Sequence, residues 1–118
     1  MSVPVIDPGF LGGMVAAGTT QVTAPPLPQN AVICVVATCA SGAGICLPGA
    51  VTSATLGNEQ YPLLGVKYTV MNNGANALLI YPPTACKINA LSNNAGYSLA
   101  AAASINLVFA SLTQVWTM

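Results

Sequence analysis

Charged side chains are almost absent from this sequence. Only 3% of its 118 residues are charged, namely Asp7, Glu59, Lys67 and Lys87, and there is no Arg and no His. Soluble domains usually carry about 25% charged residues. Proteins that bind nucleic acid use Lys and Arg to neutralise phosphates, and proteins that bind anionic membranes use basic clusters. Because this chain has too few cations for either, we expect no nucleic-acid partner and no membrane partner.

The same scarcity argues against an enzyme. General acid–base catalysis usually requires a His or a matched pair of carboxylates, and the acids Asp7 and Glu59 fall in two separate irregular stretches. Cys86 and Lys87 are adjacent, but neighbouring residues of a strand point to opposite faces. The glycine-rich phosphate-binding motifs are also missing. The sequence therefore predicts no catalytic residue and no cofactor.

The cysteines do not form a metal-binding pattern. Cys34, Cys39, Cys46 and Cys86 follow a C-x4-C-x6-C spacing with one distant member, and no His is available to complete a zinc site. A calcium site would need clustered acidic oxygens, so no metal is expected. The prediction is four free, buried thiols, with a disulfide framework as the alternative.

Long apolar runs are absent although the chain is apolar overall. Hydrophobic residues make up 54% of the sequence and the mean hydropathy is +0.70, yet no run reaches the roughly 18 residues of a membrane span. The first residues lack a basic region and include Pro4, so no secretory signal is predicted and synthesis in the cytoplasm is expected. A net charge near zero favours association. We expect a neutral polar surface that is partly buried against partners; the alternative is a monomer covered by Ser, Thr and Asn.

Short strand-like runs separated by Gly, Pro and Asn occupy residues 19–118. The runs predicted as strands are 19–24, 31–39, 45–47, 66–71, 77–81, 86–91, 105–110 and 112–116. Residues 98–104 are alanine-rich but too short for an independent helix, and are predicted to form a turn. This pattern predicts an all-β fold, a small antiparallel β-sandwich or jelly-roll-like domain over 19–118. Within it, residues 65–97 are predicted to form a β-meander.

Two of these runs have informative faces. Residues 66–71 alternate, with Tyr68 and Val70 on one face and Lys67 on the other. Residues 77–81 are apolar on both faces, which is typical of a strand covered on both sides by a second sheet or a partner. We predict Trp116 as a core anchor. The full set predicted for the core and its motifs is Asn76, Leu79, Tyr81, Pro82, Ile88, Asn89 and Trp116.

The first eighteen residues carry apolar side chains without regular periodicity. Pro4 and Pro8 exclude a helix, and several glycines interrupt any strand pattern. We predict an extended N-terminal arm over 1–18 that contacts a neighbouring subunit or another partner; the alternative is a strand packed along its own domain. The candidate interface residues are Val3, Val5, Ile6, Phe10, Leu11 and Met14.

Residues 68–118 resemble the C-terminal half of small tailed-phage virion proteins, and weaker similarity extends to residue 18. The matching positions are Asn73–Gly74, Ala75–Asn76, Leu78, Ile80–Tyr81–Pro82, Ile88–Asn89, Ser98–Ala101 and Gln114–Val115–Trp116, with Gly18–Thr19–Thr20–Gln21 and Leu47–Pro48 upstream. The chain departs from that pattern at Cys86, where a glycine is expected, and at Val115, which is inserted before Trp116. The resemblance implies a structural virion protein: a capsid decoration (cement) protein, a head fibre or a tail-fibre module, commonly β-rich and often trimeric.

The length of the chain favours one of these readings. A fibre needs a long shaft or repeats, and neither is present. We therefore expect a cement protein on the outer surface of the virion capsid, with copies of itself (as a trimer) and the major capsid protein as partners. The alternative is a fibre-tip or adhesin domain that binds a host glycan through its Asn-rich turns. A β protein unrelated to virions is the third reading.

Overall fold

The fold is all-β in the part of the chain that the structure describes. This computed structural model describes residues 10–27, 33–49 and 64–118, which contain nine strands and no helix. The strands are β1 (Phe10–Val15), β2 (Ile33–Thr38), β3 (Gly44–Cys46), β4 (Lys67–Asn72), β5 (Leu78–Tyr81), β6 (Lys87–Ile88), β7 (Tyr97–Leu99), β8 (Ser104–Phe109) and β9 (Gln114–Thr117). The all-β prediction is confirmed.

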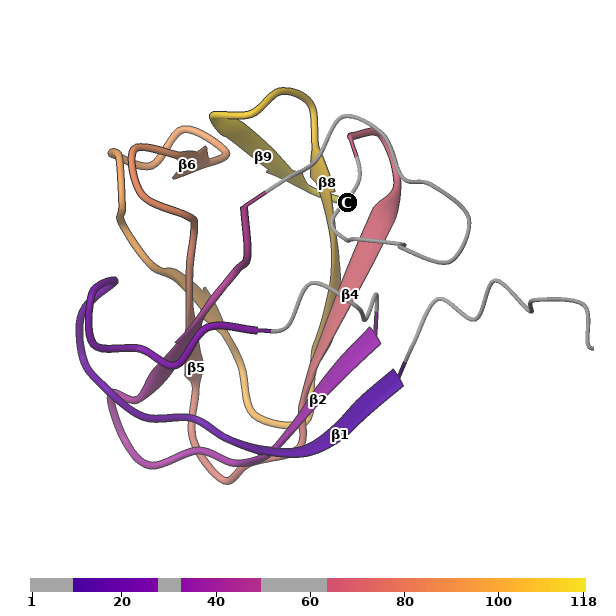
Figure 1. The fold of residues 1–118 in the computed structure, drawn as a ribbon. Helices are drawn as coiled ribbons and strands as arrows, with labels where there is room; N and C mark the ends of the chain where they lie inside the picture. Colours follow the sequence, from indigo (N-terminus) through magenta and orange to yellow (C-terminus); the bar gives the residue numbers. More distant parts are fainter. Residues whose placement is uncertain (1–9, 28–32, 50–63) are drawn as a thin grey trace, which may run out of the picture.

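The strands form two sheets that face each other (Figure 1). The large sheet has the order β1-β2-β4-β8-β9-β6, and the small sheet has the order β3-β5-β7. Between β2 and β8, consecutive strands alternate between the two sheets. The chain therefore crosses the core at every connection in this region, and the two-sheet sandwich that the sequence predicted is present.

The pairing of strands differs from the prediction. β4 pairs antiparallel with β8, β5 with β7 and β8 with β9, but β1/β2, β2/β4, β3/β5 and β6/β9 are parallel pairs. The sheets are therefore mixed rather than antiparallel. The predicted meander over 65–97 is also wrong, because β4 and β5 belong to different sheets. The Asn-rich turn between them leads across the core, and turn residues alone do not distinguish such a crossing from a hairpin.

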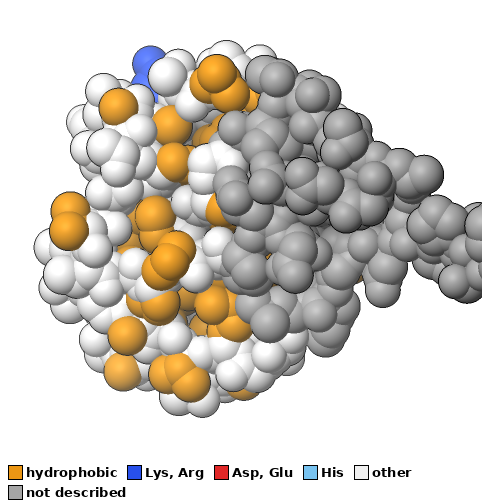
Figure 2. Space-filling view, viewed as in Figure 1, with side chains coloured by type: hydrophobic (Ala, Val, Ile, Leu, Met, Phe, Trp, Pro, Cys, Tyr) orange, Lys and Arg blue, Asp and Glu red, His pale blue; other side chains and the backbone are white. Residues whose placement is uncertain are grey.

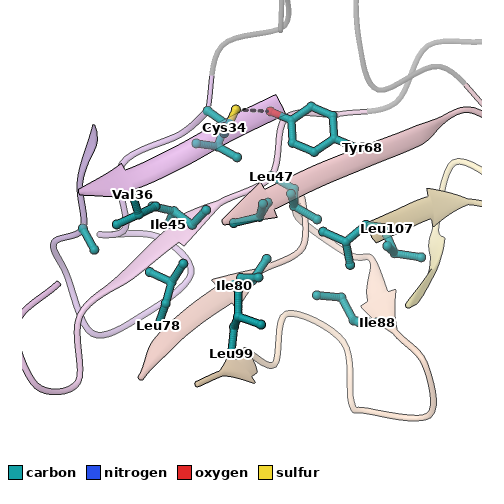
Figure 3. Close-up of a cluster of buried hydrophobic side chains, with 14 of the residues drawn as sticks. Cys34, Val36, Ile45, Leu47, Tyr68, Leu78, Ile80, Ile88, Leu99 and Leu107 are labelled. Atoms are coloured by element: carbon teal, nitrogen blue, oxygen red, sulfur yellow. Dashed lines mark hydrogen bonds between the residues drawn. The ribbon is translucent and has the colours of Figure 1, made fainter. Parts of the chain in front are cut away.

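The core lies between the sheets and is filled by alternate residues of their strands (Figure 3). In β4, Tyr68 and Val70 are fully buried while Lys67 is exposed, as predicted. In β8, Leu107 and Phe109 are fully buried. Complete burial of a side chain of this size contributes about 1.5–3 kcal/mol, so this single apolar layer is the main source of stability.

The segment 16–27, which we call the strap, pairs with β3 near both of its ends, and its middle packs on the outer side of the small sheet. The Tyr81 hydroxyl donates to the Thr19 carbonyl at 2.9 Å, and the Leu27 N–H donates to the Cys46 carbonyl at 2.8 Å. Ala24 packs with Cys46 and Tyr81, and Leu79 packs against them. The predicted burial of both faces of β5 is confirmed, and its cover comes from the same chain.

Within the strap, the strand predicted over 19–24 is absent. Those residues form a turn in which the Thr23 and Ala24 N–H groups donate to the Thr20 carbonyl at 3.2 and 2.9 Å. The hydroxyls of Thr20 and Thr23 are also hydrogen-bonded to each other, at 2.8 Å. Threonine side chains that bond locally compete with sheet pairing, which explains why the β-branched composition was misleading.

The N-terminal part of the described chain belongs to the sandwich. β1 pairs in parallel with β2, so residues 10–15 form the strand that was the alternative to an arm. Met14 packs against the core, whereas the side chains of Phe10 and Leu11 are not described. Val3, Val5 and Ile6 lie outside the described residues.

The turn between β7 and β8 yields a stability prediction. Ala102 is exposed and has a φ of +60°, a conformation that costs an L-residue about 1–2 kcal/mol. We expect Ala102→Gly to raise the free energy of unfolding by about 0.5 kcal/mol, since glycine's greater loss of entropy offsets part of the relief. Ala101→Gly is the matched control and should lower it. Urea denaturation measures both, and an equal loss in the two variants would contradict the assignment.

Candidate interaction surface

The outer face of the large sheet is the surface that turns away from the core. Because Tyr68 and Val70 point inward, Lys67, Thr69 and Met71 point outward. The register then places Val108 of β8 beside Lys67, and Trp116 of β9 beside Val108. We call the set Val35, Lys67, Thr69, Met71, Lys87, Ser104, Asn106, Val108, Gln114 and Trp116 the outer face.

Large apolar side chains on this face are exposed. Trp116 is 48% exposed and Met71 is 36% exposed, while Val35 and Val108 are half-buried. Figure 2, in the orientation of Figure 1, does not look directly onto this face; the described surface seen from that side has hydrophobic atoms scattered among neutral polar ones, with cationic atoms at one edge. The register places these side chains in two groups, Trp116 with Val108 and Met71 with Val35. Neighbouring apolar side chains on a surface mark interaction sites more often than isolated ones do.

Both lysines of the protein lie on the outer face. Lys87 pairs with Gln114 and the next residue, Ile88, pairs with buried Val115, so Lys87 points to the same side as Gln114 and Trp116. Lys67 is on β4, two strands from Trp116 on the opposite side. With strands about 4.8 Å apart, the backbone of Lys67 is about 10 Å from that of Trp116. Trp116 is thus flanked by the only cations of the chain.

Hydrogen bonds hold the strand that carries Trp116. The Asn89 side chain accepts from the Thr117 N–H at 3.0 Å and donates to the Thr117 hydroxyl at 2.8 Å. Gln114 Nε2 donates to the Asn89 carbonyl at 3.0 Å. Asn89 has a φ of +52°, which Asn tolerates better than most residues. We call these three hydrogen bonds the β6–β9 lock. They explain why Asn89 belongs to the predicted motif.

The Asn-rich turns use their amides internally. Asn76 Nδ2 donates to the Cys39 carbonyl at 2.9 Å, and Asn94 Oδ1 accepts from the Ala85 N–H at 2.8 Å. Asn72 is fully buried, and its Nδ2 lies 2.9–3.2 Å from the carbonyls of Asn76, Leu99 and Ala100. These amides hold turns together and are not directed at a ligand.

The remaining residues predicted for the core divide into two groups. Tyr81, Pro82 and Ile88 are buried and Leu79 is half-buried, in agreement with the prediction. Trp116 as a core anchor is wrong, because Val115 is fully buried in its place. β9 pairs Val115 with buried Phe109, and side chains alternate along a strand, so the neighbouring residue must face outward. Trp116 is the functional candidate that the sequence reading misplaced.

The thiols are free and buried, as predicted. Burial raises the pKa of Cys34, Cys39, Cys46 and Cys86. Cys34 Sγ lies 3.1 Å from the Tyr68 hydroxyl (Figure 3), and burial, more than this contact, raises the pKa of Tyr68. Because the thiolate is the reactive form of cysteine, these groups are suited to packing and not to nucleophilic chemistry.

The burial of the four thiols leads to two predictions, one for their rate of alkylation and one for the pH dependence of stability. Iodoacetamide at pH 8 should modify the native protein at least about 100-fold more slowly than the urea-unfolded chain, since the native thiols are both covered and protonated.

Above about pH 8.5 the unfolded chain releases thiol protons that the folded chain retains, so the free energy of unfolding should fall as the pH rises. Mass spectrometry and thermal scans from pH 7 to 10 measure the two effects. Rapid native labelling would contradict the buried placement.

Within residues 10–27, 33–49 and 64–118 there is no group of three or more His, Cys, Asp and Glu that could hold a metal ion. The same residues contain no helix long and apolar enough to cross a membrane. No protein-family model matches this chain, and neither a curated protein nor a solved structure matches it.

Proposed function

We propose that this protein is a bacteriophage capsid decoration (cement) protein that binds the outer capsid and stabilises the shell. The observation that carries the proposal is the outer face, which exposes Trp116 and Met71 among neutral polar side chains and both lysines of the chain. The resemblance of residues 68–118 to phage virion proteins points in the same direction. A protein that binds only the assembled shell stabilises it by mass action.

The proposal includes self-association as a homotrimer, for which the same resemblance and the net charge of zero are the support. Analytical ultracentrifugation of the purified protein tests it. A test of the N-terminal arm needs a deletion narrower than the predicted arm of residues 1–18. Removing residues 2–17 would delete β1 from the large sheet, so only residues 2–9 should be removed before capsid binding is measured.

The experiment that tests the function is mass spectrometry of purified virions, followed by binding to capsids that lack the protein. We expect one stoichiometric component of the virion that rebinds empty capsids and raises their temperature of disruption. Absence from virions would contradict the proposal and favour a β protein unrelated to virions.

A fibre-tip or adhesin role is the second candidate. Its sequence basis, the Asn-rich turns, is weakened because Asn72, Asn76 and Asn94 use their side chains within the chain. Exposed Trp116 is the observation that still favours it, because an aromatic ring packs well on a sugar ring. Strong glycan-array binding together with a location on the tail would select this candidate.

A further inference from the structure

We propose that the outer face docks on a surface of the major capsid protein that presents carboxylates beside an apolar pocket, with Trp116 entering the pocket and Lys67 and Lys87 pairing with the carboxylates. This inference rests on the proposed function and names the chemistry of its partner. The occupant is argued from three properties of the face.

The first property is the position of the charges. Lys67 and Lys87 are exposed and lie on opposite sides of Trp116. Among the described residues, all the charge on this face is therefore positive. Charges at the rim of an interface act mainly by complementarity with the partner. A partner for this face consequently presents acidic groups at its own rim.

The second property is the central aromatic side chain. Residues that dominate binding energy are most often Trp, Tyr and Arg near the centre of an interface, surrounded by contacts that exclude water. Trp116 has Val108 beside it in the register, and Met71 is exposed on the same face. The β6–β9 lock fixes the strand beneath Trp116, so little order has to be gained on binding.

The third property is that the face does not complement itself. In a two-fold contact the same patch meets its own copy, so Lys67 and Lys87 of each copy would meet a positive face whose described residues include no acid. Like charges brought together in this way disfavour the contact. A two-fold contact of this face with its own copy is therefore disfavoured. The contacts of a trimer join two different patches of the chain, and we assign the outer face to a different protein.

The test measures co-sedimentation with capsids that are prepared from the encoding phage without this protein. We expect Trp116→Ala to weaken binding at least about tenfold and Lys67→Glu or Lys87→Glu to weaken it about fivefold each. Wild-type affinity should decrease as NaCl rises, and the double Lys→Glu variant should lose that dependence. Val22→Ala is the matched control. Val22 is 88% exposed and belongs to the strap, which lies on the side of the small sheet and away from the outer face, so this variant should bind as the wild type does. Thermal melts check that each variant is folded.

The outcomes separate this inference from the function on which it rests. If the wild-type protein binds capsids and the outer-face variants bind equally well, the docking face is overturned and the decoration function stands. If the wild-type protein does not bind capsids, both fail. Conversion of the oligomer to monomer by Trp116→Ala, with unchanged binding per subunit, would show that a second copy occupies the face. Loss of glycan binding alone would show that a sugar occupies it; either result overturns the proposal.

Discussion

Phe109→Ala is expected to lower the free energy of unfolding by about 4 kcal/mol, whereas Trp116→Ala should lower it by less than about 1 kcal/mol. Both changes remove an aromatic ring from adjacent strands of the large sheet, so the comparison isolates burial. Phe109 is fully buried, and its removal leaves a cavity that the surrounding side chains cannot close; Trp116 is 48% exposed and loses only partial contacts.

Urea denaturation with a common slope measures both changes. If Phe109→Ala does not fold, Phe109→Leu, with an expected loss of about 1–1.5 kcal/mol, keeps the comparison possible. A Trp116→Ala loss as large as that of Phe109→Ala would place Trp116 in the core. It would also remove the basis for the outer face as an interaction surface.

Asn72→Ala is expected to lower the free energy of unfolding by about 3 kcal/mol. Asn72 is the single buried polar residue among those described. Its Nδ2 donates hydrogen bonds to the carbonyls of Asn76, Leu99 and Ala100, and its Oδ1 accepts one from the Gly74 N–H at 3.0 Å. Each buried polar group left without a partner costs about 1–3 kcal/mol, and water entering the new space offsets part of that sum.

The neighbouring residue provides the control for this change. Asn73 is exposed and its backbone N–H donates to the Val36 carbonyl at 2.8 Å, a bond that Asn73→Ala retains. We expect Asn73→Ala to alter stability by no more than about 0.5 kcal/mol. Equal losses in the two variants, measured by urea denaturation, would contradict the assignment of Asn72 as the residue that joins these turns.

Alternation of side chains was enough to predict several features of the fold. The inward face of β4, the inward placement of Ile88 and the two-sided burial of β5 all follow from the local pattern. Asn72 could have been found in the same way, because it shares the parity of Tyr68 and Val70. The strand predicted from the sequence ends one residue earlier, at 71, because Asn-Asn-Gly is also typical of turns.

Other features depended on contacts distant in sequence. The direction of each strand is set by which sheet the preceding turn enters, and the sequence between β4 and β5 permits either a hairpin or a crossing. The outward position of Trp116 depends on the pairing of Val115 with Phe109, and a shift of one residue would reverse it. The outer face joins residues of β4, β6, β8 and β9, which no local pattern brings together.

The most direct measurement of the central claim is a cryo-electron microscopy reconstruction of the virion at a resolution that separates the two sheets. We predict density for this sandwich on the outside of the shell, with the outer face of the large sheet against the capsid protein and Trp116 in an apolar pocket. Density in which the strap side faces the shell would contradict the docking face. A shell without this protein, or its location at the tail tip, would contradict the decoration function.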